Sequence, residues 1–154
     1  MLGLKKISDE VFYSEEVVSS IGEEEIHFLK RMAGRSKRGR CRICCHPDPS
    51  AQLHDMIVVH EKGCYVRPHA HPDKHESLMV IEGNADFMIF DAVGNLDQVI
   101  QIGDERFAKC FVRTPPMTFH SLVIKSRYLV FHEATTGPFQ KNASIFPCWS
   151  PKDG

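Results

Sequence analysis

The chain has 154 residues, of which 42% are hydrophobic and 25% charged, and its formal net charge is −1 with histidine neutral. This length and composition predict one soluble globular protein with room for a hydrophobic core. The balanced charge gives no general attraction to nucleic acid or membrane, no apolar run approaches the roughly 20 residues of a membrane span, and the first residues lack the apolar core of a signal peptide, so we expect a cytoplasmic protein that binds neither nucleic acid nor membrane.

One helix is predicted near the N-terminus. Ser20 and Glu23 have the three-residue spacing of a capping box, which satisfies the first amide groups of a helix. Apolar side chains then recur at helical intervals as far as Ala33, and Gly34 follows as a helix-ending residue. We therefore expect residues 1–39 to form an N-terminal extension with one helix.

Short strands separated by turn signals follow from Arg40 onward. Many short strands at regular spacing are typical of an all-β sandwich or barrel, so residues 40–154 are predicted to form a barrel with a C-terminal capping segment, in which Trp149 covers one barrel end. The expected strands are Arg40–Cys45, Asp55–Glu61, Tyr65–His71, Ser77–Glu82, Ala85–Asp91, Leu96–Ile102, Cys110–Thr114, His120–Lys125 and Arg127–Glu133.

The cysteines are expected to be reduced thiols, because the chain is large for a disulfide scaffold and shows no export signal. Cys41, Cys44 and the nearby His46 have the spacing of half a structural zinc site, but no second pair at this spacing follows. The six cysteines are Cys41, Cys44, Cys45, Cys64, Cys110 and Cys148.

The stretch GCYVRPHAHPDKHESLMVIEG, residues 63–83, carries a candidate metal site. Side chains alternate between the faces of a strand, so His69 and His71 point the same way and can reach one ion. Glu76 follows a short reversal that can return its carboxylate to the same ion. A fourth ligand should come from a distant strand, for which His120 is the candidate. Single histidines are most often ordinary core or surface residues, but this combination favours a metal.

The same stretch resembles the first sequence motif of the cupin superfamily. That motif is Gly, five residues, His-x-His, three or four residues, Glu, six residues and Gly. Here Gly63, His69, His71, Glu76 and Gly83 satisfy every spacing. The resemblance implies a double-stranded β-helix of the jelly-roll type, with these histidines and the glutamate as metal ligands.

The second cupin motif is only partly present. Pro115 and His120 occupy their expected places, but Met117 stands where glycine is usual and Ile124 where asparagine is usual. The resemblance therefore supports His120 as a ligand less firmly than the ligands of the first motif.

Over most of the chain the sequence is similar to the cupin-fold metalloproteins of the WbuC family, whose members are often encoded among polysaccharide or O-antigen biosynthesis genes. The resemblance implies a fold and a metal but no settled reaction. It rests on Arg40-x-Arg42-x-Cys44-x-His46, Tyr65-x-Arg67-Pro68-His69-x-His71, Lys74-x-Glu76-Ser77, Phe90-Asp91-x-x-Gly94, Glu133 with Gly137-Pro138-Phe139, and Trp149-x-Pro151.

Several cationic and polar side chains are expected to bind a small anionic molecule beside the metal. Arg67 shares the strand face of the two histidines, and an arginine side chain can form bidentate hydrogen bonds with a carboxylate or phosphate. Alternatively, the arginines form structural ion pairs with Asp55, Asp91 or Glu133. The candidate ligand-binding residues are Arg67, Lys74, Arg40, Arg42, Cys44 and His46.

Two classes of function stay open. In the first, the protein is a metal-dependent oxygenase, isomerase or lyase acting on an anionic or sugar-derived substrate. Glu133 is then the candidate acid or base, and Tyr65 either donates a proton or fills the barrel. In the second, it is a metal-containing binding or regulatory module without turnover.

Three imidazoles and one carboxylate suit one divalent ion of Fe, Zn, Mn, Ni or Co. Open sheet edges also favour a homodimer.

Overall fold

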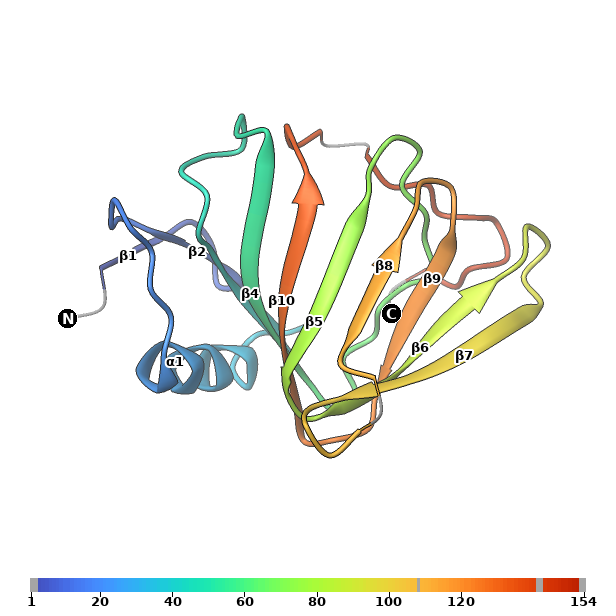
Figure 1. Ribbon diagram of the computed structural model, residues 1–154, viewed down its shortest axis with the longest axis horizontal. Coiled ribbons are helices and arrows are strands. Elements are labelled where there is room, and N and C mark those ends of the chain that lie inside the picture. Colours follow the sequence, from blue (N-terminus) through green and yellow to red (C-terminus); the bar gives the residue numbers. More distant parts are fainter. Residues whose placement is uncertain (1–2, 108, 141–142, 153–154) are drawn as a thin grey trace.

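The computed structural model describes residues 3–107, 109–140 and 143–152, which form one helix and ten strands in two curled sheets. The sheets face each other as a half-open barrel (Figure 1), which confirms the predicted all-β jelly-roll architecture. The elements are β1 Leu4–Lys6, β2 Val11–Ser14, α1 Glu23–Ala33, β3 Arg40–Cys44, β4 Leu53–Glu61, β5 Glu76–Glu82, β6 Asn84–Phe90, β7 Leu96–Gly103, β8 Phe111–Thr114, β9 Phe119–Ile124 and β10 Tyr128–Thr136.

The larger sheet has the strand order β1-β2-β3-β4-β10-β5-β8, and the smaller one has the order β7-β6-β9. Neighbouring strands are antiparallel except β2 and β3, which are parallel. Between the sheets lies an apolar core that includes Leu78, Phe87, Leu122 and Phe131. Apolar and polar side chains alternate along these strands because each strand turns one face towards this core and the other away from it.

Helix α1 covers the outer face of β3 and β4. Leu29 and Ala33 are fully buried against Ile43 and Val59 in a second apolar cluster. The helix ends at Gly34 as predicted, but it begins two residues later than the capping box at Ser20 and Glu23 would place it. Gly22 is the N-cap, and its N–H donates to the Glu25 carboxylate at 2.8 Å.

Two strands in the N-terminal segment were not predicted. β1 and β2 form a hairpin, and β2 then pairs with β3 through Val11–Arg42 and Tyr13–Cys44. Each strand is three or four residues long, too short for a periodic pattern to be recognised. The strands β1 and β2, which precede Arg40, therefore belong to the same sheet as the strands that follow.

The predicted strand Tyr65–His71 is wrong. This segment is extended but makes only two isolated bridges, His69 with His120 and Ala70 with Ile145. Pro68 and Pro72 flank the bridged residues, and proline has no amide hydrogen for a strand ladder. The segment consequently crosses between the sheets and carries the two histidines into the barrel.

Candidate metal centre

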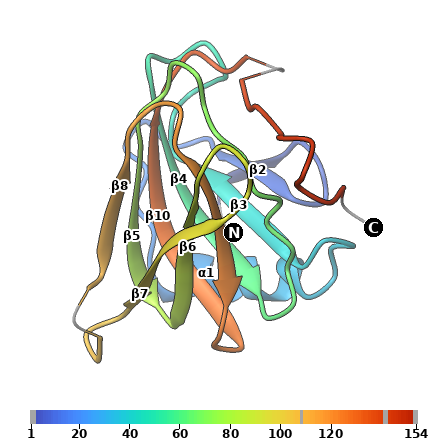
Figure 2. The same ribbon diagram turned by 90° about the vertical axis from the view of Figure 1, so that its right-hand side faces the viewer.

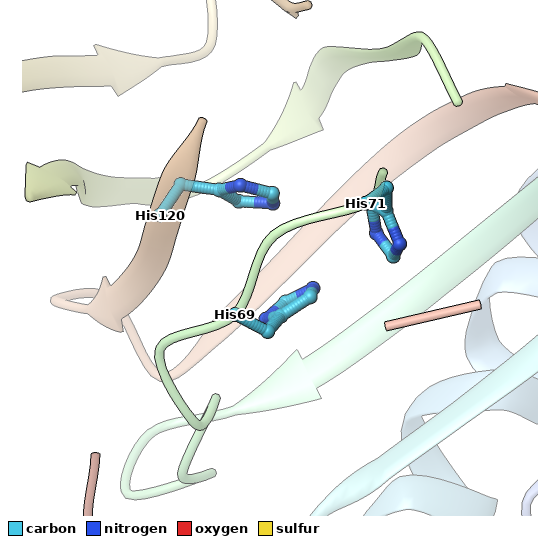
Figure 3. Close-up of side chains that lie close together, drawn as sticks. All are labelled: His69, His71 and His120. Atoms are coloured by element: carbon cyan, nitrogen blue, oxygen red, sulfur yellow. The ribbon is translucent and has the colours of Figure 1, made fainter. Parts of the chain in front are cut away.

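Three imidazoles from two distant parts of the chain meet inside the barrel (Figure 3). His69 and His71 come from the extended segment and His120 from β9, and one ligand nitrogen of each lies within 4.8 Å of the others. The backbones of His69 and His120 exchange two hydrogen bonds, with N–O distances of 3.1 and 2.9 Å. This direct pairing places the distant histidine opposite the His-x-His pair.

The other ring nitrogen of each histidine is fixed by a backbone carbonyl. Since a carbonyl only accepts, each Nδ1 carries a proton, and Nε2 is the nitrogen that each neutral imidazole could offer to an ion, an arrangement that metal-binding histidines usually show. The acceptors are Arg67 O for His69 at 2.7 Å, Ala143 O for His71 at 3.1 Å, and Thr118 O for His120 at 2.9 Å.

Glu76, the first residue of β5, completes the group. Its carboxylate oxygens lie 3.3 Å from His71 Nε2 and 3.4 Å from His120 Nε2. Burial raises the pKa of this carboxyl, but hydrogen bonds from the protonated imidazoles of His120 and His71 outweigh burial and hold the pKa far below its ordinary value. Burial lowers the pKa of His69 to about 4, so its imidazole is neutral at pH 7. Burial acts to lower the pKa of His71 as well, but its hydrogen bond to Glu76 outweighs burial and raises that pKa. An ionised carboxylate with imidazoles that can give up an Nε2 proton fits a divalent transition metal.

The turn before His120 explains how the incomplete second motif still delivers a histidine. Met117 adopts a positive φ of 62°, the conformation for which glycine is the usual residue. Its N–H donates to the carbonyl of His71 at 2.8 Å, which ties the turn to the His-x-His segment. The missing glycine therefore changes the residue type but not the path of the backbone.

A cavity of about 1470 Å³ opens beside the histidines. All six residues predicted to bind a ligand line it, together with Glu133. Their surroundings differ, however. Arg40 pairs with Glu10 of the N-terminal hairpin at 3.4 Å, and His46 bonds the Asp55 carbonyl at 3.1 Å and stacks on His54. Arg42 and Lys74 form no ion pair with any described residue.

Arg67 is held by the C-terminal segment, a contact that the sequence did not predict. Its Nε donates to Ser150 Oγ at 2.7 Å and its Nη2 to Ser150 O at 3.1 Å, while its guanidinium lies 4.6 Å from the centre of the Phe146 ring. Among the described residues it pairs with neither Glu133 nor an aspartate. The structure thus favours a structural role for Arg67, although with a different partner from those expected.

The C-terminal segment, residues 143–152, forms one wall of the site. Figure 2 shows it on the opposite side of the molecule from β8. Ala143 and Ser144 both contact Nδ1 of His71, at 3.1 and 3.3 Å. Trp149 packs against Phe90 and Phe119 in the smaller sheet. The capping role predicted for the segment stays a prediction.

Glu133 and Tyr65, the two candidate catalytic residues, are placed differently. Burial, and next the Glu76 carboxylate, raise the pKa of Glu133 to about 7, although Arg42 acts in the opposite direction. Glu133 can therefore exchange a proton near neutral pH inside the cavity. Tyr65 does not line the cavity; it is exposed, and its hydroxyl donates to Pro151 O at 3.0 Å.

The sequence model of the family described as "Domain of unknown function (DUF6016)" matches residues 21–102, more than half of the chain. The chain belongs to this family. A comparison with curated protein sequences finds no match. The resemblance to the WbuC family stays a prediction.

Several solved structures share the fold of this DUF6016 protein. One is the capsular polysaccharide assembling protein CapF from Staphylococcus aureus, with a TM-score of 0.58 and 16% identity over 73% of this chain and 32% of that chain. Another is KdgF from Halomonas sp., with a TM-score of 0.51 and 16% identity over 67% of this chain and 82% of that chain. A Klebsiella pneumoniae protein with a double-stranded β-helix domain is also similar, with a TM-score of 0.50 and 15% identity over 68% of this chain and 79% of that chain. This chain spans about a third of the CapF chain, and identities this low show the fold alone.

None of the described helices is long and apolar enough to cross a membrane.

Proposed function

We propose that this protein binds one divalent transition metal through His69, His71, His120 and Glu76 and acts as an enzyme on a small anionic molecule. The observation that carries the proposal is the orientation of the three imidazoles, each with Nδ1 bonded to a carbonyl. These bonds turn the three Nε2 atoms towards a shared centre beside the Glu76 carboxylate, which is the donor set that a divalent transition metal uses.

The cavity residues support catalysis rather than binding alone. A bound ion would supply Lewis acidity towards a carbonyl, carboxylate or hydroxyl oxygen. Glu133 lines the same cavity and titrates near neutral pH, so it is suited to accept or donate a proton at a bound molecule. The cations Arg42 and Lys74 line the cavity too and favour an anionic ligand.

Sugar acids are the first class of substrate to test. The similar fold of CapF, described as assembling capsular polysaccharide, supports a sugar-derived substrate and a link to polysaccharide biosynthesis. Hydroxy acids also chelate divalent ions through a carboxylate and a neighbouring hydroxyl. A sugar acid therefore matches both the ion and the cations of the cavity.

The metal is tested by elemental analysis of protein purified without a metal-affinity tag. We expect about one divalent ion per wild-type chain and a loss of most of it in His71→Ala, which removes one arm of the His-x-His pair. His75→Ala is the matched control, because His75 is exposed and bonds Arg113 outside the cluster. Equal metal content in His71→Ala and wild type would contradict the site.

Turnover is then tested by screening sugar acids and keto acids with metal-loaded protein, including protein loaded with Fe(II) under anaerobic conditions before oxygen is admitted. Product formation that disappears on metal removal supports an enzyme. Metal-dependent binding without any turnover would instead favour a binding or regulatory module.

A further inference from the structure

The ligand cavity reaches well beyond the metal centre. Strand register places Glu76 beside Thr135 of β10, which pairs with His54 of β4, and β3 and β2 continue the sheet. Cavity-lining side chains occur on all five of these strands. Neighbouring strands lie ~4.8 Å apart, so β3 is ~14 Å from β5 along the sheet. The unpredicted N-terminal hairpin thus extends the binding surface at the end remote from the metal.

Two cavity-lining cations at this remote end, Lys5 and Arg42, form no ion pair with a described residue, and Arg42 lies nearer to the metal centre because Lys5 is on β1 at the edge of the sheet. Arg38 and Arg40 both pair with Glu10, so their charges are shared with one carboxylate. Arg42 lines the cavity, is exposed, and forms no ion pair with any residue that the structure describes. Its cross-strand neighbours Val11 and Val58 line the same cavity, which places Arg42 on the inner face.

Polar groups that suit a bound anion lie beside Arg42. Tyr13 follows Val11 by two residues on β2 and lines the cavity next to Cys44. Glu133 lies on β10, between β5 with its metal ligand and β3 with Arg42, and is close enough for Arg42 to oppose the burial that raises its pKa. The candidate acid or base therefore stands midway between the metal and the remote cation.

Building on the proposed function, we propose that the substrate is an elongated sugar acid with two anionic ends, one chelating the metal and the other, a phosphate or second carboxylate, bound by Arg42. The cavity volume of about 1470 Å³ exceeds the roughly 300–1,000 Å³ of common small-molecule sites. A single carboxylic acid would leave Arg42 without a partner, whereas a molecule with a second anionic group at its far end uses both ends of the cavity.

The test compares three six-carbon acids by titration calorimetry with metal-loaded protein. Gluconate has one anionic end, 6-phosphogluconate adds a phosphate at the other end, and glucarate adds a carboxylate there. We expect the better of the two doubly anionic acids to bind about ten- to hundredfold more tightly than gluconate, as one charge-assisted contact would give. The acid that binds more tightly, 6-phosphogluconate or glucarate, shows whether the second anionic group is a phosphate or a carboxylate.

Arg42→Gln should remove this advantage while leaving gluconate affinity and metal content unchanged. Arg40→Gln is the matched control, because Arg40 lies two residues away on the same strand face but pairs with Glu10. The control should keep the advantage. Melting curves of both variants check that they fold.

Equal affinities for all three acids in the wild type would overturn the inference, as would equal losses in the two variants. Absence of binding by all three acids would overturn it as well. If the three acids bind equally and gluconate binds only to the metal-loaded protein, the inference fails but the proposed function survives. Absence of metal from the wild-type protein is the separate result that overturns the proposed function.

Discussion

His60 on β4 is a buried base whose Nδ1 atom has no hydrogen-bond partner among the described residues. Burial lowers its pKa to about 3, and the positive charges of Arg40 and Arg42 act in the same direction. In the unfolded chain the pKa of histidine is about 6.5. The folded protein therefore excludes the charged form of His60, while the unfolded chain binds a proton as soon as the pH falls below about 6.5.

This difference predicts a loss of stability in acid. Below about pH 6.5 the unfolded state binds one more proton than the folded state, so the free energy of unfolding falls as the pH drops towards 4. His60→Leu removes this proton while keeping an apolar side chain against Phe131. Denaturant titrations give the free energy of unfolding at pH 7.5 and 4.5. The variant's free energy of unfolding relative to wild type should be about 2 kcal/mol higher at pH 4.5 than at pH 7.5. An identical pH slope for both proteins would mean that His60 takes up its proton without unfolding.

The C-terminal segment 143–152 is an element without a helix or strand that nevertheless shapes the site. It is joined to the extended segment by the Ala70–Ile145 bridge and by the contacts of Arg67 with Phe146 and Ser150. Because Ala143 and Ser144 support His71, the order of this segment and the position of one metal ligand are connected. Arg67 is best understood as the residue that holds the segment in place.

Arg67→Met should loosen this wall without removing a metal ligand. We expect a loss of about 1–2 kcal/mol in unfolding free energy and faster amide hydrogen exchange in residues 143–150, because two hydrogen bonds and a cation–aromatic contact disappear. Gluconate affinity should stay close to the wild-type value.

Lys74→Met serves as the control for stability and hydrogen exchange, because Lys74 forms no ion pair with a described residue and lies 6.0 Å from the Phe139 ring, outside residues 143–150. Should Arg67→Met instead weaken gluconate binding at least tenfold with unchanged exchange, Arg67 would contact the ligand, as its strand position first suggested.

Across the whole molecule, the four candidate ligands come from three different elements. Glu76 belongs to the larger sheet, His120 to the smaller one, and His69 and His71 to the segment that crosses between them. An ion held by all four would connect both sheets of the half-barrel and bind the folded state only. The edge strands are β1 and β8 in the larger sheet and β7 and β9 in the smaller one, and the homodimer expected from open edges stays a prediction.

Metal removal should therefore lower thermal stability. An ion at about 100 times its dissociation constant contributes about 2.7 kcal/mol, which for a chain of this size corresponds to roughly 5–10 °C in melting temperature. We expect a fall of this size when wild-type protein is treated with a chelator and dialysed, and its recovery when a divalent ion is restored. His71→Ala should show little response to the same treatment. An unchanged wild-type melting curve would argue against an ion that bridges the sheets.

Local patterns in the sequence were enough for the fold class and for the four candidate metal ligands. Strand alternation and turn residues act over a few positions, and the Gly63–Gly83 spacing places His69, His71 and Glu76 near one another whatever the distant chain does. His120 was identified by its motif, yet its exact place depends on Met117 taking a positive φ, which no propensity of methionine predicts.

Contacts between distant residues were decided only by the tertiary structure. Arg67 and Ser150 lie 83 residues apart in the sequence, and nothing near either residue marks the other as its partner. The strands β1 and β2 are too short to be stable alone and exist because β3 offers them an edge. Charge balance in the cavity has the same origin: the Glu10 carboxylate pairs with the Arg40 side chain and not with that of Arg42 because the hairpin docks in one register, and register is a property of the assembled sheet.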